Sequence, residues 1–215
     1  MSSATLTSAD QEQLERLRSL ATKEPERAKN AAWKWFGELQ APAQHHKLPW
    51  LFEQGTAPEA PHGDCEGIVM NLYGSPWLAG LDKLVRLGQI LGGIGWTGKS
   101  FDTVTRTGYN RLTATSRIPA FLTMPTYAFD RIKGELIGFR FHFAEEVSPA
   151  APKTNVLAIR YDDPAHANPL VLPRTRDELV EIVPRVYLGR ALLQEKGGWQ
   201  VVGYFGLRYP AGGRK

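Results

Sequence analysis

The sequence contains one cysteine, Cys65, among its 215 residues. A single cysteine cannot form an internal disulfide, and it excludes a zinc site built from several cysteines. No apolar run reaches the roughly 20 residues that a membrane-spanning helix needs, and the first residues show no signal-peptide pattern. These absences predict a cytoplasmic protein without a membrane partner.

Concentrated charge of one sign is also missing. The formal net charge is +4 and the isoelectric point is about 9.2, but the basic residues are scattered along the chain. Because nucleic-acid-binding proteins gather Lys and Arg on one face, we expect no nucleic-acid partner. Hydrophobic residues at 42% and charged residues at 22% are ordinary for a globular domain of this length.

The densest glycine region, residues 92–102, carries two motif matches. Residues 93–100 fit the phosphate-loop pattern GxxxxGK[ST], and Gly93, Gly95 and Gly98 also fit GxGxxG. A phosphate loop lies after a buried strand and before a helix, because the helix N-terminus and the loop amides together hold the anion. The segments that flank the glycines therefore decide between the interpretations.

The flanking segments come in the reverse order. Residues 75–91 have the capping residues and apolar spacing of a helix, whereas residues 101–109 are rich in β-branched side chains and indicate a strand. We therefore interpret the region as a helix-to-strand entry in which Gly95 and Gly98 make room around the Trp96 indole. Nucleotide binding is the weaker alternative.

Two helices are expected near the N-terminus. Ser8 begins a capping-box pattern, and Pro25 begins a second amphipathic segment. We expect residues 1–40 to form a helical extension packed on the outside of the main body, and residues 41–215 to form a single β-barrel domain. Within that domain, residues 41–61 have the prolines of a loop.

Short strands separated by turn signals account for most of the remaining chain, which is typical of an antiparallel barrel or sandwich. The predicted strands are residues 63–73, 95–107, 109–116, 126–130, 135–147, 155–161, 186–195 and 199–209. A capping-box pattern at residues 175–178 predicts one helical turn between the strands at 155–161 and 186–195.

The clearest alternation lies in residues 135–147, where phenylalanines alternate with Arg140 and His142. Two arrangements are open. The phenylalanine face packs beneath the N-terminal helices and leaves Arg140 and His142 inside the barrel, or the phenylalanines themselves line the interior.

Two short blocks resemble a known group of proteins. Gly95-Trp96-Thr97-Gly98-Lys99-Ser100-Phe101-Asp102 is similar to the W-x-GK-x-F core of GXWXG-domain and lipocalin-like (calycin-type) β-barrel proteins, and the hairpin of residues 186–190 and 202–205 resembles their closing strands. The resemblance covers roughly residues 48–209. It implies a mainly β protein with an antiparallel lipocalin-like β-barrel, N-terminal helices and one helix inserted before the GWTGKSF strand.

The chain departs from this group in two respects. The helix predicted at residues 75–91 stands where typical lipocalins have a loop. No histidine follows His166, so the C-terminal haem ligand of nitrobindin-type barrels has no counterpart. We expect no cofactor and no metal. The resemblance implies a cavity for a hydrophobic small molecule, and barrels of this shape also serve as cyclases.

The candidate site residues are polar or aromatic side chains on the predicted strands, because alternate positions of each strand face the inside of a barrel. His142, Arg140 and Tyr187 are the catalytic candidates, with His142 able to act as general acid or base near neutral pH. A surface position for His142 and Arg140 is the competing interpretation. The substrate-binding candidates are Trp96, Lys99, Tyr109, Tyr161, Arg190, Tyr204, Asp64 and Glu66.

These observations predict a protein that binds a hydrophobic small molecule and catalyses its cofactor-independent cyclisation or isomerisation. A non-catalytic carrier is the alternative, and a phosphate-loop nucleotide-binding protein is the third. A homodimer is left open.

Overall fold

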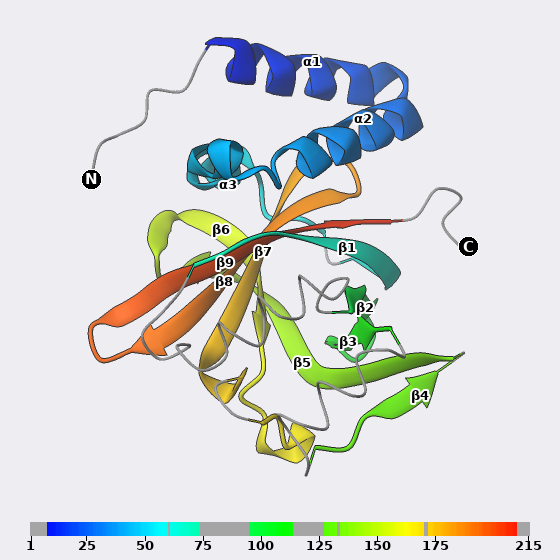
Figure 1. Cartoon of the computed structure of the whole chain (residues 1–215), viewed down its shortest axis with the longest axis vertical. Helices are drawn as coiled ribbons and strands as arrows, with labels where there is room; N and C mark the ends of the chain where they lie inside the picture. Colours follow the sequence, from blue (N-terminus) through cyan, green and yellow to red (C-terminus); the bar gives the residue numbers. More distant parts are fainter. Residues whose placement is uncertain are drawn as a thin grey trace.

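The computed structural model describes residues 8–59, 61–73, 95–113, 127–132, 134–169 and 172–209 (Figure 1). The helices are α1 (Ser8–Lys23), α2 (Pro25–Glu38), α3 (Leu48–Gln54) and the 3-10 helices η1 (Pro42–Lys47), η4 (Pro164–His166) and η5 (Leu172–Arg174). The strands are β1 (Gly63–Leu72), β2 (Trp96–Asp102), β3 (Thr107–Leu112), β4 (Asp130–Ile132), β5 (Glu135–Ser148), β6 (Ala151–Arg160), β7 (Thr175–Val183), β8 (Val186–Glu195) and β9 (Gly198–Arg208).

The strands form a closed, eight-stranded antiparallel barrel, which confirms the predicted fold class. Each barrel strand pairs with the next one along the chain, in the order β1, β2, β3, β5, β6, β7, β8, β9, and β9 returns to pair with β1. The short strand β4 pairs with β5 outside this circle. The predicted hairpin of β8 and β9 is confirmed.

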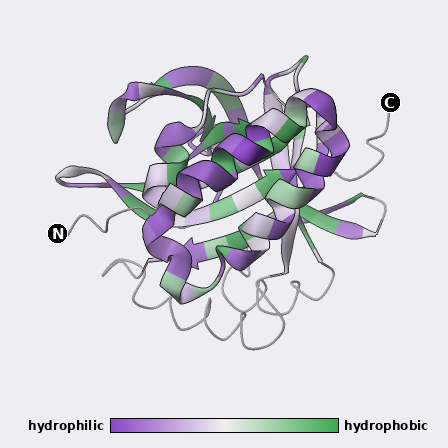
Figure 2. Ribbon diagram, turned by 90° about the horizontal axis from the view of Figure 1, so that it is seen from above, coloured by the Kyte–Doolittle hydropathy of each residue, from purple (hydrophilic) through white to green (hydrophobic). Residues whose placement is uncertain are grey.

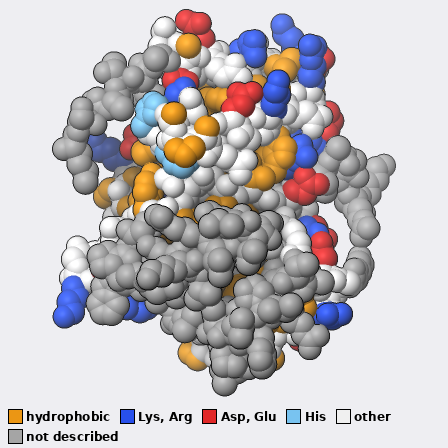
Figure 3. Space-filling view, in the orientation of Figure 1, with side chains coloured by type: hydrophobic (Ala, Val, Ile, Leu, Met, Phe, Trp, Pro, Cys, Tyr) orange, Lys and Arg blue, Asp and Glu red, His pale blue; other side chains and the backbone are white. Residues whose placement is uncertain are grey.

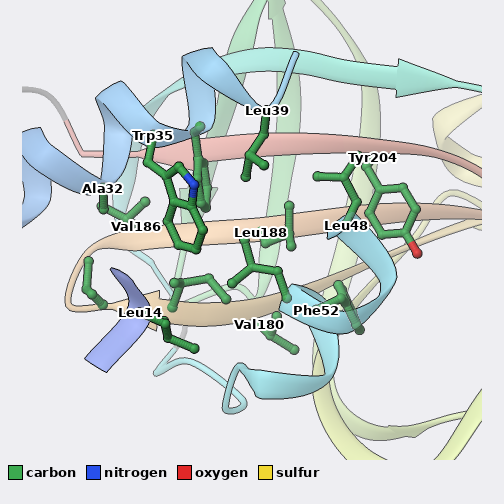
Figure 4. Close-up of a cluster of buried hydrophobic side chains, with 14 of the residues drawn as sticks. Leu14, Ala32, Trp35, Leu39, Leu48, Phe52, Val180, Val186, Leu188 and Tyr204 are labelled. Atoms are coloured by element: carbon green, nitrogen blue, oxygen red, sulfur yellow. The ribbon is translucent and has the colours of Figure 1, made fainter. Parts of the chain in front are cut away.

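The helices cover one side of the barrel (Figure 1). Their apolar faces pack on the outward-pointing side chains of β7, β8, β9 and β1 in a single cluster, part of which is drawn in Figure 4. Gly206 makes this close packing feasible, because a Cβ atom there would lie 2.7 Å from the Phe36 ring. Figure 2 looks down on the helices, whose outward turns carry many hydrophilic residues.

The expectation of a loop at residues 41–61 is wrong in part, since η1 and α3 occupy residues 42–54. Pro42 and Pro49 lie in the first turns of these helices, where a missing N–H costs little. Leu48, Leu51 and Phe52 have the i, i+3, i+4 spacing of a helix face, and all three are 0% exposed. The segment therefore contributes to the core beneath α1 and α2.

The helical turn predicted at residues 175–178 is also wrong, because these residues begin β7. The competing signal is a period of two: Glu178, Val180 and Ile182 face outward towards the helices, whereas Asp177 and Leu179 face inward. Tertiary pairing with β6 and β8 outweighs the local capping preference. The helix predicted at residues 75–91 lies outside the described residues.

Candidate functional site

Lys99 and Asp177 join opposite walls of the barrel. Lys99 lies on β2 and Asp177 on β7, and four steps from strand to strand separate β2 from β7 in either direction round the barrel. The Lys99 Nζ atom lies 2.9 Å from Asp177 Oδ2, and the two side chains are 3% and 8% exposed. The ion pair therefore crosses the interior instead of bordering it.

Tyr161 and Asn110 complete a polar network around this pair. Lys99 Nζ donates to Tyr161 Oη over 2.6 Å and to Asn110 Oδ1 over 2.9 Å. The Tyr161 hydroxyl in turn donates to Asp177 Oδ2 over 2.7 Å. Trp96 adds an N–H that donates to Asn110 Oδ1 over 3.0 Å. We call Trp96, Lys99, Asn110, Tyr161 and Asp177 the cross-barrel network.

A bulge in β2 brings Trp96 and Lys99 to the same face. The pairing of β2 with β3 shifts register between Trp96 and Gly98, and Gly98 adopts a φ of +141° that other residues rarely adopt. A Cβ atom at Gly98 would lie 1.9 Å from the Cys65 carbonyl oxygen, so only glycine permits this approach of β1 and β2. The Trp96 ring fits over Gly67, where a Cβ atom would lie 2.5 Å from it.

The room for the indole is thus provided by Gly67, and Gly98 serves the strand approach. The expectation that Gly98 makes room around Trp96 is corrected in this respect. Gly98 explains the W-x-G-K spacing: it permits the bulge that turns the tryptophan and the lysine into the interior together.

A second irregularity, in β5, positions Asn110. Phe139 has a φ of +50°, a left-handed conformation that is unfavourable for a bulky residue. Its carbonyl accepts a hydrogen bond from Asn110 Nδ2 over 3.0 Å, and its N–H donates to the Tyr127 hydroxyl over 2.6 Å. The strained backbone thus supplies an acceptor that orients the amide of the network.

Aromatic rings enclose the lysine. Lys99 Nζ lies between 5.3 and 5.7 Å from the ring centroids of Trp96, Phe141, Tyr161 and Phe205. The faces of such rings attract a cation, which partly replaces its lost hydration. Burial lowers the pKa of the Lys99 ammonium, and the charge of Asp177 acts in the opposite direction. Burial also raises the pKa of Tyr161 well above its usual value, and Asp177 adds to the shift.

The network separates two parts of the interior. Towards the end where β2 finishes, apolar side chains fill the space, with Phe101, Phe141, Phe143, Leu157, Ile159, Leu179, Tyr187 and Leu207 among them. Towards the end where β2 begins, Trp96 and Phe139 are only partly buried. Ala191, which lies directly opposite Asp177 in the pairing of β7 and β8, is also only partly buried. The described side chains are thus less completely buried towards the second end than towards the first.

Four of the predicted site residues face the interior. Trp96, Lys99 and Tyr161, three of the substrate-binding candidates, belong to the cross-barrel network, and the structure brings them together. Tyr187 also faces inward, but it lies in the packed part of the interior, where burial raises the pKa of its hydroxyl. It contacts Tyr209 edge-on, with ring centroids 6.4 Å apart.

Arg140 and His142 lie on the outside of the barrel, because the phenylalanines of β5 line the interior. Arg140 pairs with Asp130 of β4 over 2.7 Å, and His142 Nε2 lies 3.6 Å from Asp162 Oδ1. The arrangement with Arg140 and His142 inside is thus wrong. Neither residue belongs to the interior site.

The remaining candidates Tyr109, Asp64 and Glu66 lie on the outer face of the barrel. Tyr109 alternates with the inward Asn110 along β3, and the exposed Asp64 alternates with the buried Cys65 along β1. Glu66 receives a hydrogen bond from Arg208 over 2.9 Å.

Arg190 and Tyr204 lie beneath the helices. The Arg190 guanidinium stacks 4.1 Å from the centroid of Phe52 on α3 and pairs with the fully buried Glu178 over 2.9 Å. Tyr204 packs edge-on against Phe52, and burial raises the pKa of its hydroxyl to about 12. Both side chains attach α3 to the barrel and do not contact the interior.

Asp177 and Asn110 are the site residues that the sequence reasoning missed. Asp177 was hidden by the capping-box interpretation of residues 175–178, although the β-branched residues Val180, Ile182 and Val183 that follow favour a strand. Asn110 gives no comparable signal. Its role depends on the bulges at Gly98 and Phe139, which a single sequence does not show.

Comparisons with protein-family models, with curated proteins and with solved structures found no match. The described side chains include no group of three or more His, Cys, Asp or Glu that is placed to hold a metal ion. None of the described helices is both long and apolar enough to cross a membrane. On the face seen in Figure 3, basic and acidic side chains are interspersed over the upper half of the molecule.

Proposed function

We propose that the protein binds an apolar small molecule inside the barrel, against the cross-barrel network and from the end where β2 begins. The observation that carries this proposal is the buried Lys99–Asp177 pair in an interior lined mainly by aromatic and aliphatic side chains. Ligand sites commonly combine apolar walls with a few fixed polar groups. An eight-stranded barrel is wide enough for one small ligand. The similarity to lipocalin-like proteins is part of the same proposal.

Stability alone gives little reason for such a pair. Removing two charges from water costs several kcal/mol per ion, and apolar side chains of similar volume often stabilise a core at least as well. A ligand-binding role explains the ion pair better than a stabilising role does. Polar groups that are fixed by hydrogen bonds to one another keep their geometry when a ligand enters. Trp96 and Phe205, whose ring centroids are 5.6 Å apart, supply the adjacent apolar wall.

The test is a titration with N-phenyl-1-naphthylamine, a neutral dye whose fluorescence rises in apolar sites. The parent protein should show saturable binding with one dye per chain. Ala191→Phe, which places a ring beside Asp177, should abolish the signal, whereas Ala144→Phe on the outer face of β5 should retain it. Circular dichroism confirms that each variant is folded. Absence of saturable binding, or equal binding by both variants, would overturn the proposal.

As a finer proposal, the bound molecule undergoes a cofactor-independent proton shift, as in an isomerisation or cyclisation. In this proposal Asp177 Oδ1 accepts the proton and returns it. Lys99 and Tyr161 hold the second oxygen of the carboxylate, Oδ2, in place. Conversion of a β,γ-unsaturated ketone to its conjugated isomer, followed by ultraviolet absorbance, is expected with the parent and not with Asp177→Asn. Saturable dye binding without any conversion would assign the carrier role instead.

A further inference from the structure

Every N–H and O–H donor of the cross-barrel network is hydrogen-bonded within the protein, whereas one of its acceptor oxygens has no described donor. The ammonium of Lys99 has three N–H donors, and they match its three acceptors Asn110 Oδ1, Tyr161 Oη and Asp177 Oδ2. The Tyr161 hydroxyl donates to Asp177, and the Trp96 indole N–H donates to Asn110.

The amide of Asn110 is occupied as well. Its Nδ2 donates to the Phe139 carbonyl over 3.0 Å and lies 3.4 Å from Tyr161 Oη. Its Oδ1 accepts from both Trp96 and Lys99. The amide therefore offers a ligand neither a donor nor an acceptor.

Asp177 differs from the other members of the network. Both of its interactions, with Lys99 and Tyr161, use Oδ2. Among the residues that the structure describes, none donates a hydrogen bond to Oδ1. The side chain is 8% exposed, so this oxygen belongs to a carboxylate that is more than nine-tenths buried. An acceptor that the described donors leave free in a mostly buried carboxylate is available to a donor that a ligand brings.

We propose that the interior site selects apolar molecules that carry a hydroxyl group, alcohols or phenols, and that Asp177 Oδ1 accepts the hydrogen bond from that hydroxyl. A carboxylate ligand such as a fatty acid meets a like charge at Asp177 and finds no donor in the network. An ether of the same shape brings no donor either. This inference rests on the proposed function and adds the chemical class of the ligand.

The experiment compares three naphthalenes of similar shape as competitors of the N-phenyl-1-naphthylamine dye. They are 2-naphthol, 2-methoxynaphthalene and 2-naphthoate. A hydrogen bond to a charged acceptor is expected to make 2-naphthol displace the dye at about tenfold lower concentration than either of the others. Equal displacement by 2-naphthol and 2-methoxynaphthalene, a preference for 2-naphthoate, or displacement by none of the three would overturn the inference.

A double variant ties the preference to the ion pair. Lys99→Met combined with Asp177→Leu replaces the charges by apolar side chains of similar length and is expected to fold. Calorimetry should show that the double variant binds 2-naphthol and 2-methoxynaphthalene with equal affinity. Retention of the full preference in the double variant would contradict the role of Asp177. If the parent protein binds the dye but shows no preference for 2-naphthol, this inference fails while the proposed function stands.

Discussion

Trp96 and Lys99 stand three residues apart on one strand, yet both donate a hydrogen bond to the same atom, Asn110 Oδ1, over 3.0 and 2.9 Å. In a regular strand, residues three apart point to opposite faces of the sheet. The bulge at Gly98 removes this difference and turns both side chains inward. The geometry of the interior site therefore depends on one glycine that is not itself a member of the cross-barrel network.

Gly98→Ala is expected to lower the free energy of unfolding by about 3 kcal/mol or more, because the new Cβ atom meets backbone at a φ that is unfavourable for alanine. Gly37→Ala is the matched control. Gly37 has open space around it in α2, and there alanine should stabilise by about 0.5–1 kcal/mol. Urea denaturation of both variants measures the difference. A Gly98→Ala protein as stable as the parent would show that the bulge is not required.

Asp177→Leu alone should destabilise the protein by about 3–5 kcal/mol, because it leaves the Lys99 ammonium buried without its counter-ion. The same substitution in a Lys99→Met background should cost much less. Denaturation of the parent, the two single variants and the double variant gives the coupling energy between the two positions. Additive effects within about 0.5 kcal/mol would mean that the ion pair is not formed in solution.

Acid should weaken the protein through Glu146. Burial alone would raise the pKa of this carboxyl, but hydrogen bonds from Arg160 and Arg176 outweigh it and hold the pKa below the usual value of 4.5. A lowered pKa in the folded state contributes stability above that usual value, and the contribution is lost as the pH falls through the folded value.

Glu146→Gln should therefore reduce the loss of stability between about pH 5 and pH 3, measured by urea denaturation at each pH. Glu145→Gln, at the exposed neighbouring position on β5, serves as the control and should keep the parent's pH dependence. If the two variants lose stability equally, the contacts with Arg160 and Arg176 do not govern the acid response.

The literal phosphate-loop match predicts nothing about nucleotides, because Lys99 lies within β2 and uses its ammonium donors inside the barrel. Calorimetry with ATP and magnesium should show no binding at micromolar concentrations. An affinity in that range that disappears in Lys99→Ala would contradict the position of Lys99 described above.

The sequence predicts the architecture well where hydrophobic periodicity dominates. The alternation in β5 and the Lys196-Gly197-Gly198 turn between β8 and β9 were sufficient to place both elements. Prediction fails where tertiary contacts decide. The buried residues of α3 lie among prolines that indicate a loop, and the first residues of β7 carry a local preference for a helix turn that pairing with its neighbours overrides.

The site itself was predictable only in part. Lys99, Trp96 and Tyr161 follow from their residue types and from the strand pattern, but period two alone cannot say which face of a strand is inside. Once the helices are seen to cover β7, β8 and β9, the inward face is fixed, and Arg140 and His142 fall outside.

Closure of the barrel also has a consequence for self-association. A strand with unpaired backbone groups is a template on which another chain can add, and a closed barrel removes such strands. In the part of the chain that the structure describes, β4 is the strand that lies beyond the circle, and it comprises only Asp130, Arg131 and Ile132. With two of its three residues charged, β4 is too short and too polar to seed an intermolecular sheet, so the described strands offer another chain a long edge only when the barrel opens.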